Sequence, residues 1–425
     1  MKFTRVSVIG LGYVGLPTAA VLASRGVEVV GVDVNPLTVD TINRGQIHIA
    51  EPELDIIVQS VVNTGRLRAV RRPEPADAFV VAVPTPFRDG HQPDLSYIEA
   101  AAASFAPVLK SGDLVVLEST SPVGTTERLC RWLAEARPDL TFPDHGRTPG
   151  DVFVAYCPER VFSGRILREL VDNDRVIGGM TPSCTGAAKS LYRLFVQGAL
   201  LGTCARTAEM AKLAENAFRD VNIAFANELS LLCDRVGINV WELIELANHH
   251  PRVNILQPGA GVGGHCIAVD PWFLVAMAPD EARLIRTARQ VNDHKPAVIV
   301  ARVNERIAAK GIRSVAILGL AFKPDVDDLR ESPAVAIARG IAAGNPSVRV
   351  DIVEPYVDAL PQELASLPNA SLVEVETALG RAELVVGLVR HRAIVEALER
   401  LGVPPVDFLD FVNFVSYQRE RGRGA

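Results

Sequence analysis

The sequence predicts an α/β protein in which two doubly wound domains are joined by a long central helix and a helical middle domain. Three observations lead to this prediction. Short apolar strands alternate with helical segments in the first half, the span Thr203 to Val236 holds neither glycine nor proline, and the N-terminal strand pattern returns after Gly311. At 425 residues the chain is too long for one core. The predicted domains are 1–200, 201–305 and 306–425.

Composition narrows the classes of function. The chain is 48% hydrophobic with a formal net charge of -6, which indicates a soluble protein and argues against a nucleic-acid partner. No two of its cysteines have metal-ligand spacing, so we expect no metal and a reducing compartment. The uncharged segment Val6 to Ala23 looks like a signal peptide, but three glycines and Pro17 interrupt it. We therefore expect a cytoplasmic protein with no membrane partner.

The N-terminal segment has the pattern of a dinucleotide-binding unit. A strand at Val6 to Ile9 runs into Gly10-Leu11-Gly12-Tyr13-Val14-Gly15, and a helix and a second strand then lead to Asp33. The glycines allow the turn and bring a pyrophosphate to the positive end of the helix. A carboxylate at Asp33 is placed to accept hydrogen bonds from ribose hydroxyls and to repel a 2′-phosphate. The pattern predicts a Rossmann-like domain that binds NAD rather than NADP.

More strand-helix units follow. The strand Ala78 to Val83 runs into the turn Pro84-Thr85-Pro86, and the strand Leu114 to Leu117 runs into Glu118, Ser119 and Thr120. In open α/β sheets these carboxyl ends line the ligand crevice, so we expect Thr85 and Thr120 to face the cofactor. The alternative is that they are ordinary loop hydroxyls.

A strand at Phe153 to Tyr156 delivers Cys157 to Arg160 at another strand end. The span Thr203 to Val236 then reads as one helix. On it Lys212, Asn216 and Arg219 are spaced i, i+4, i+7 and share one face. The alternative for this row is a solvated face of the helix.

A glycine-rich stretch follows the helix. Four of the six residues from Gly259 to Gly264 are glycines, Cys266 stands two residues after the last of them, and Asp270 stands four residues further on. A backbone of this kind bends sharply and approaches a ligand closely, so the thiol of Cys266 is a candidate nucleophile. The alternative is a surface turn with an inert cysteine. Two helices, Leu284 to Asp293 and Pro296 to Lys310, are predicted next.

The C-terminal third repeats the N-terminal pattern with changes. Val315 to Phe322 echoes Val6 to Tyr13, and the strand Val348 to Val353 ends at Glu354 as the earlier one ends at Asp33. Lys323 stands where backbone amides would hold a pyrophosphate. We therefore expect a second Rossmann-like domain that binds a phosphorylated ligand in another manner.

Taken together, these residues resemble the UDP-glucose/UDP-N-acetylmannosamine dehydrogenase family, the UDP-sugar 6-dehydrogenases. The resemblance rests on motifs along nearly the whole chain: Gly10 to Gly15, Pro84 to Pro86, Glu118 to Thr120, Pro158-Glu159, Lys212 to Asn216, Gly263 to Cys266, Phe322-Lys323 and Arg330 to Ser332. Within the family the sequence is most similar to members that act on UDP-N-acetyl-D-mannosamine. UDP-glucose dehydrogenases usually carry a lysine where Val269 stands.

The resemblance implies oxidation of the sugar C6 alcohol to a carboxylate by two NAD molecules. A thiohemiacetal and a thioester on Cys266 would link the two oxidations. Lys212 and Asn216 would donate to the oxygen that becomes negative. Asp270 and Glu159 are candidates to position water. The sequence does not rank Lys212, Asp270 and Glu159 as the base.

The resemblance also implies two sets of ligand contacts. The residues expected at NAD are Tyr13, Val14, Asp33, Thr85, Thr126 and Arg330, beside the glycine loop. Those expected at the UDP-sugar are Arg160, Val161, Lys212, Asn216, Arg219, His250, Arg252, Gly263, Phe322 and Lys323. A homodimer is expected, in which Arg252 completes the neighbour's site.

Rival functions make different demands. A UDP-sugar epimerase generally carries Tyr-x-x-x-Lys, and no tyrosine here has lysine four residues on. A two-electron dehydrogenase of the 6-phosphogluconate type would need no nucleophilic cysteine. UDP-glucose and UDP-N-acetylglucosamine stay open as alternative substrates, and a non-catalytic NAD sensor is the last alternative.

Overall fold

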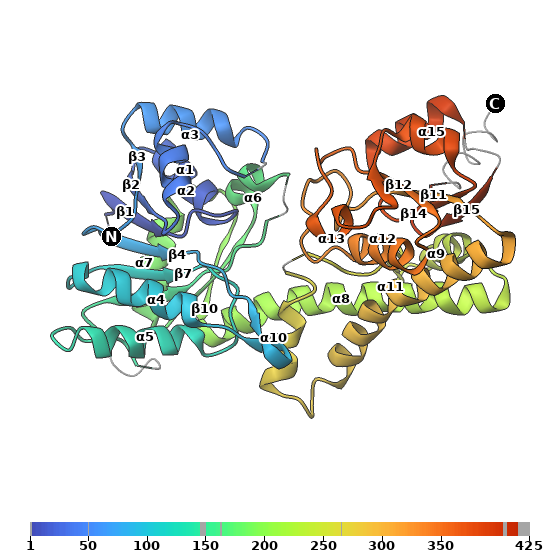
Figure 1. Ribbon diagram of the computed structural model, residues 1–425. Helices are drawn as coiled ribbons and strands as arrows, with labels where there is room; N and C mark the ends of the chain where they lie inside the picture. The colour runs from blue at the N-terminus through green and yellow to red at the C-terminus, as the bar shows by residue number, and fades with distance from the viewer. Residues whose placement is uncertain are drawn as a thin grey trace. The chain divides into compact units, whose positions relative to one another are not determined.

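The computed structural model describes residues 2–49, 51–144, 150–161, 164–264, 266–402 and 406–414 (Figure 1). The chain divides into two compact units, Met1–Glu215 and Asn216–Ala425. The predicted middle domain, 201–305, contributes residues to both units, so its independence stays a prediction. Within the described residues, no helix combines the length and the apolar character needed to cross a membrane.

The first unit is built on one eight-stranded sheet of order β10-β9-β8-β7-β4-β1-β2-β3. From β3 to β8 this is the 3-2-1-4-5-6 order of a dinucleotide-binding fold, which confirms the predicted Rossmann-like domain. The pair β8–β9 is antiparallel and the other pairs in this sheet are parallel. The strands are β1 (Arg5–Ile9), β2 (Glu28–Val32), β3 (Leu67–Val70), β4 (Ala78–Val81), β7 (Leu114–Leu117), β8 (Phe153–Tyr156), β9 (Arg175–Gly179) and β10 (Leu200–Cys204).

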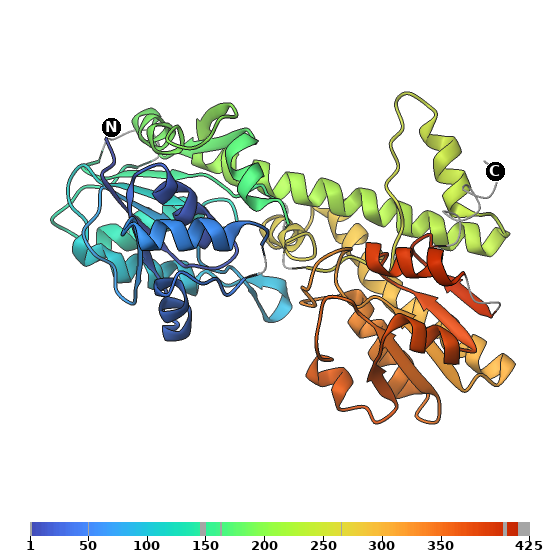
Figure 2. The same ribbon diagram turned by 90° about the horizontal axis from the view of Figure 1, so that it is seen from above.

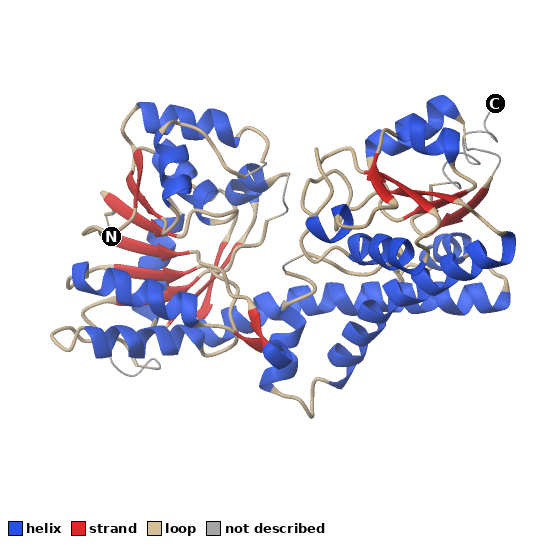
Figure 3. Cartoon of the chain, viewed as in Figure 1, coloured by secondary structure: helices blue, strands red, loops and turns tan. Residues whose placement is uncertain are grey.

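Helices cover both faces of this sheet (Figure 3). Alternate strand residues point to opposite faces, so Val6 and Val8 pack in one core while Ile9 and Phe79 pack in the other. The helices are α1 (Gly15–Ser24), α2 (Pro36–Asn43), α3 (Leu54–Asn63), α4 (Ser96–Phe105), α5 (Thr125–Ala136), α6 (Ile166–Asp172) and α7 (Pro182–Tyr192). A short hairpin, β5 (Phe87–Arg88) and β6 (Gln92–Pro93), follows β4.

The second unit ends in a five-stranded parallel sheet of order β13-β12-β11-β14-β15, drawn in orange and red in Figure 2. This order confirms a second Rossmann-like sheet. The strands are β11 (Ser314–Leu318), β12 (Arg349–Val353), β13 (Ala370–Leu372), β14 (Leu384–Gly387) and β15 (Asp407–Asp410). The helices after β11 are α12 (Pro333–Gly344), α13 (Gln362–Ala365), α14 (Val375–Arg381) and α15 (Arg392–Leu401).

The predicted long helix is present as α8 (Ala205–Val236). Its start differs from the prediction, because Thr203 and Cys204 close β10 and pair with Gly178 and Gly179 of β9. Those pairings satisfy backbone groups at the edge of the sheet, so the helix begins only afterwards. Helices α9 (Val240–Asn248) and α10 (Asp270–Met277) follow.

The two helices predicted on either side of Pro296 are in fact one, α11 (Arg283–Lys310), with Pro296 inside it. A proline removes one helical hydrogen bond and usually breaks the helix. Here side chains in the same turns are buried against α8. The amide of Asn292 donates to Asp220 Oδ1 at 2.8 Å, and Lys295 donates to Ser230. These contacts hold the helix through the proline.

Candidate functional site

In the glycine loop after β1, close packing excludes a side chain at Gly10 and Gly15, whereas Gly12 faces open space. A Cβ on Gly10, whose φ is +91°, would lie 2.6 Å from the carbonyl oxygen of Ala82. One on Gly15 would lie 1.8 Å from the oxygen of Gly10, whereas at Gly12 no atom lies within 4 Å. Within the described part of the chain, the Gly12 amide has no protein acceptor. The loop therefore fits the pyrophosphate of a dinucleotide at the start of α1.

Asp33 follows β2 at the side of this loop. Its carboxylate accepts hydrogen bonds from the amides of Leu11, at 3.0 Å, and Asn35, at 2.9 Å. The side chain is half-buried, as are Tyr13 and Val14 in the loop itself. The carboxylate is thus fixed beside the cradle, where the sequence places the ribose contact.

The strand-end hydroxyls are tied to one another and to the protein. Thr85 Oγ1 donates to the carbonyl oxygen of Thr120 at 2.6 Å, which joins the ends of β4 and β7. Thr126 is buried, and its amide and hydroxyl both donate to Glu209 Oε1, at 2.8 and 2.6 Å. The structure thus brings Thr85 and Thr120 together, while Thr126 is engaged by a carboxylate of α8. Their cofactor contacts stay predictions.

Glu159, a candidate for positioning water, is buried. Its two oxygens accept from Arg175 Nη1 at 3.0 Å and from the Arg160 amide at 2.6 Å. The guanidinium of Arg160 forms an ion pair with Glu215 at 2.6 Å, and Val161 beside it is half-buried. Glu159 is therefore held by an arginine that the sequence did not single out.

Glu118 is a buried acid whose chemistry the sequence reasoning missed. It accepts from the Tyr192 hydroxyl at 2.5 Å and from Thr18 at 3.4 Å. Burial raises the pKa of Glu118 to about 7, and the negative charge of Glu159 adds to the rise. Its position directly after β7 was the available signal, because strand ends of this kind face the ligand crevice.

The cysteine loop lies in the second unit. The carbonyl oxygen of Cys266 accepts from the amides of Val269, at 3.0 Å, and Asp270, at 2.8 Å. This turn makes Asp270 the first residue of α10. The Asp270 side chain is buried and accepts from the side-chain amide of Asn216. The structure therefore joins the loop of Cys266 and Asp270 to Asn216 of α8, and the reactivity of the thiol stays a prediction.

The glycines of this loop are required by its packing. A Cβ on Gly263 would lie 2.4 Å from the carbonyl oxygen of Glu331, and one on Gly264 would lie 2.9 Å from the ring of Phe322. The cysteine loop therefore lies against the segment after β11 that carries Phe322 and Lys323. Lys323 Nζ lies 5.6 Å from the centre of the Phe322 ring. Arg330 pairs with Asp328 at 2.6 Å in the same segment.

Lys212, Asn216 and Arg219 share one face of α8, as predicted. Lys212 is buried and belongs to the first unit, and Asn216 opens the second. His250 and Arg252 follow α9 on the surface of the second unit, where the Arg252 amide donates to His250 Nδ1 at 3.3 Å.

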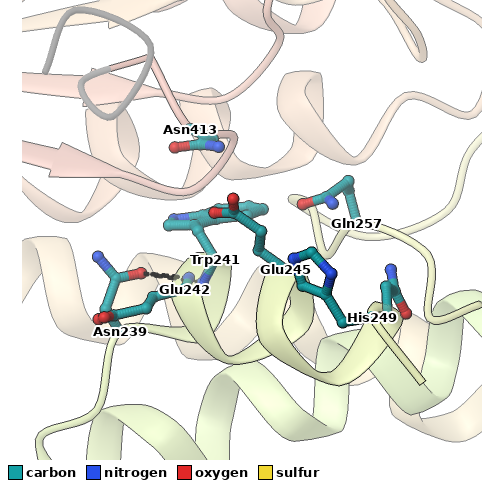
Figure 4. Close-up of a pocket in the computed structure, with 8 residues that line it drawn as sticks. Asn239, Trp241, Glu242, Glu245, His249, Gln257 and Asn413 are labelled. Atoms are coloured by element: carbon teal, nitrogen blue, oxygen red, sulfur yellow. Dashed lines mark hydrogen bonds between the residues drawn. The ribbon is translucent and has the colours of Figure 1, made fainter. Parts of the chain in front are cut away.

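A polar pocket of about 540 Å³ lies beside α9 (Figure 4). Asn413, which follows β15, lies across it from the side chains of α9. No predicted site residue lines the pocket. It is lined by Asn239, Trp241, Glu242, Glu245, Asn248, His249, Gln257 and Asn413. Separately, among the described residues no group of three or more His, Cys, Asp or Glu side chains is arranged to hold a metal ion.

Comparison with known proteins places the whole chain in one family. Three models of the UDP-glucose/GDP-mannose dehydrogenase family match it: the NAD binding domain at residues 4–196, the central domain at 206–294 and the UDP binding domain at 316–415. The chain is 61% identical over 394 residues, 92% of each chain, to NDP-N-acetyl-D-galactosaminuronic acid dehydrogenase of Ralstonia nicotianae.

Two further similarities concern another N-acetylated sugar. Over 399 residues, 92% of this chain and 94% of the other, it is 58% identical to UDP-N-acetyl-D-mannosamine dehydrogenase of Escherichia coli (strain K12). The solved UDP-D-ManNAc dehydrogenase of Pyrococcus horikoshii superposes with a TM-score of 0.86 at 40% identity, covering 97% of this chain and 96% of that one. With its dinucleotide-binding loop, its cysteine loop and these matches, the chain belongs to the UDP-glucose/GDP-mannose dehydrogenase family and is an NAD-dependent UDP-sugar dehydrogenase.

Proposed function

We propose that this protein oxidises the C6 alcohol of UDP-N-acetyl-D-mannosamine to the carboxylate of UDP-N-acetylmannosaminuronate. The observation that carries the proposal is a loop that holds Cys266 and Asp270, lies against Phe322 and is joined to Asn216 of α8 through the Asp270 side chain. This arrangement supports a role for the Cys266 thiol beside the UDP binding domain. The relatives named for N-acetyl-D-mannosamine support the choice of sugar. The family ranges also support the three-domain division 1–200, 201–305 and 306–425.

The chemistry assigns a step to each residue. The Gly10–Gly15 loop would hold NAD, which would supply a hydride acceptor for each of the two oxidations. After the first, Cys266 Sγ adds to the C6 aldehyde and its proton passes to a base, which gives a thiohemiacetal. Loss of a second hydride from C6 leaves a thioester on Cys266. Water then cleaves the C–S bond, releases the uronate and returns the thiol.

The negative oxygen that forms on C6 needs donors. Lys212 and Asn216, one turn apart on α8, would supply them, and the loss of one such donor costs ~3 kcal/mol in the barrier. Asp270 accepts from Asn216 and so orients its amide. The base is one of Lys212, Asp270 and Glu159, and the carboxylate of Glu159 already accepts from Arg175 and from the Arg160 amide.

A second candidate substrate is UDP-N-acetyl-D-galactosamine, because a relative with 61% identity is named for N-acetyl-D-galactosaminuronic acid. The test is a side-by-side assay of UDP-N-acetylmannosamine, UDP-N-acetylgalactosamine, UDP-N-acetylglucosamine and UDP-glucose, with NADH counted per molecule of substrate. We expect the highest kcat/KM with UDP-N-acetylmannosamine and two NADH per turnover. One NADH would indicate a two-electron dehydrogenase and none an epimerase. A higher kcat/KM with another sugar would contradict the assigned substrate.

We also propose that the protein is a homodimer. Phe218, Phe225 and Leu232 repeat every seven residues along α8 and are 71%, 54% and 54% exposed. A stripe of large apolar side chains at this spacing is typical of a helix that packs against a second helix. His250 and Arg252 are exposed in the same unit and would complete the neighbour's site.

A further inference from the structure

The two Rossmann-like sheets have corresponding positions. In the first unit β1 pairs with β2 and β4, and in the second β11 pairs in the same way with β12 and β14. Counted along these registers, Gly319 corresponds to Gly10, and Glu354 corresponds to Asp33. Both glycines have positive φ, +91° in each case. A difference between the two loops can therefore be assigned residue by residue.

The amide cradle after β11 is filled by a carboxylate. Glu354 is buried, and its Oε2 accepts from the amides of Leu320, at 2.7 Å, and Ala321, at 2.9 Å. In the first unit Asp33 accepts from the amide of Leu11 but not from that of Gly12, the counterpart of Ala321. The extra methylene of Glu354 accounts for the longer reach. A phosphate oxygen at this place would meet a carboxylate instead of an amide donor.

His391 closes the same cradle from the end of β14, where it corresponds to Thr85. It is fully buried, and its Nε2 lies 3.0 Å from Glu354 Oε2. Its Nδ1 accepts from the amide of Asp325 at 3.0 Å. Because Nδ1 is an acceptor, the ring proton lies on Nε2 and is donated to Glu354. One imidazole therefore connects three loops at the carboxyl edge of the sheet.

The loop held in this way is longer than its counterpart. Helix α1 begins at Gly15, within the glycine motif, whereas α12 begins only at Pro333. In the segment between β11 and α12, Asp325 adopts a φ of 59°. Its Oδ1 accepts hydrogen bonds from the Arg392 amide at 2.8 Å and from the Tyr356 hydroxyl at 3.1 Å. The same loop carries Phe322 and Lys323.

We propose that Glu354 and His391 are positioning residues for the UDP-sugar. They close the cradle of the C-terminal sheet to a dinucleotide pyrophosphate, and they hold residues 320–325 in the shape that presents Phe322 and Lys323 to the UDP moiety. The inference rests on the proposed function, in which those two residues bind the substrate.

The test is titration of the full-length protein with UDP, the moiety common to all the candidate substrates, and separately with NAD. His391→Phe removes both contacts of the ring, and we expect the Kd for UDP to rise about tenfold or more. The KM for the UDP-sugar should rise in parallel, with the Kd for NAD within about twofold of wild type. His391→Gln keeps a donor for Glu354 and should recover part of the affinity.

Further variants separate the proposed role from misfolding and from effects that any substitution in this unit would have. Tyr356→Phe removes only the hydroxyl bond to Asp325 on a partly exposed side chain, and we expect a rise of about twofold to threefold in the Kd for UDP. His294→Asn and Glu363→Gln alter exposed residues of the same unit and should leave UDP binding unchanged.

Wild-type UDP affinity in a folded His391→Phe protein would overturn the inference. So would an equal loss of UDP and NAD affinity, since that would indicate a general structural defect. A failure of the proposed function can be told apart from a failure of this inference. If the wild type binds UDP but oxidises none of the sugars, the substrate assignment is wrong. The UDP titrations still decide the role of His391 in that case.

Discussion

Cys266 differs from the other cysteines in its surroundings. All six lie among the described residues and carry thiols rather than disulfides. Cys130 and Cys157 are buried, and burial raises the pKa of each thiol, that of Cys157 to about 12. Cys204 is exposed, and a hydrogen bond with the Thr207 hydroxyl lowers its pKa. Accessibility therefore leaves two thiols to compare, and only Cys266 lies in the glycine-rich loop.

The first prediction concerns this pair. Cys266→Ser should abolish uronate formation, by about a thousandfold or more, because a serine ester does not form readily from the aldehyde at this site. NAD and UDP-sugar should still bind, as measured by titration. Cys204→Ser is the matched control and should keep wild-type turnover. Uronate production by Cys266→Ser at near the wild-type rate would contradict the covalent mechanism.

Glu118 links a buried charge to stability. In the unfolded chain its pKa is near the ordinary value of 4.5, and in the folded protein burial raises it to about 7. Between these values the folded state holds a proton that the unfolded state has lost. The contribution of Glu118 to stability is therefore full below the unfolded pKa and is lost as pH rises through the folded pKa.

The second prediction follows from this linkage. The unfolding free energy of the wild type should fall as pH rises from about 5 to about 8, whereas that of Glu118→Gln should not, because glutamine cannot ionise. The difference between variant and wild type should therefore change by about 3 kcal/mol in favour of the variant over this range. Urea denaturation at both pH values measures the gain, with Glu99→Gln, an exposed acid of the same unit, as the control. A pH-independent difference would show that Glu118 does not titrate in this range.

At the level of secondary structure, the contact between α8 and α11 is buried and polar. Arg289 Nη1 lies 2.6 Å from Asp220 Oδ1, and the two side chains are 1% and 0% exposed. Asn292 bonds both Asp220 and Asn227, whose Oδ1 in turn accepts from the Gly259 amide at the start of the glycine-rich stretch. These hydrogen bonds thus connect the buried pair, through Asn292 and Asn227, to the start of the glycine-rich stretch.

The third prediction separates this pair from a surface pair on the same helix. Arg289→Met should lower the unfolding free energy by about 3–5 kcal/mol, because it leaves the Asp220 carboxylate buried without its cation. Arg302→Met, which breaks an exposed pair with Asp234, should cost about 1 kcal/mol or less. Denaturant titrations of both proteins provide the comparison. Equal losses of unfolding free energy in the two variants would mean that the buried pair contributes no more to stability than the exposed one.

Local patterns predicted the elements whose causes are local. Leu114–Leu117 and Phe153–Tyr156 form strands over the predicted residues, because short apolar runs bounded by polar residues fit a sheet covered on both faces. The break predicted at Pro296 was wrong, since the contacts that hold α11 come from α8, far away in sequence. The role of His391 could not be read from the sequence for the same reason, because its partner Glu354 follows a different strand, β12. The roles of the individual site residues stay predictions.

For the whole molecule, the exposed stripe on α8 bears on assembly. Phe218, Phe225 and Leu232 are exposed, whereas Leu229 of the same helix is half-buried. Val236 extends the exposed stripe to the end of the helix at 66% exposure. An isologous dimer would bury the same stripe of both copies against each other.

The last prediction tests whether such a dimer shares its active sites. Lys212→Ala and Arg252→Ala should each be nearly inactive alone, because each removes a cation proposed to contact the substrate. If Arg252 serves the neighbour's site, a mixed dimer holds one site with both lesions and one intact site. Activity should then recover to as much as half of the wild-type value per mixed dimer, measured on co-expressed, doubly tagged protein. Glu242→Gln paired with wild type, an exposed change on α9, controls for tagging and should keep full activity. Confirmed heterodimers without recovery would place Arg252 in its own subunit's site and contradict the shared-site proposal.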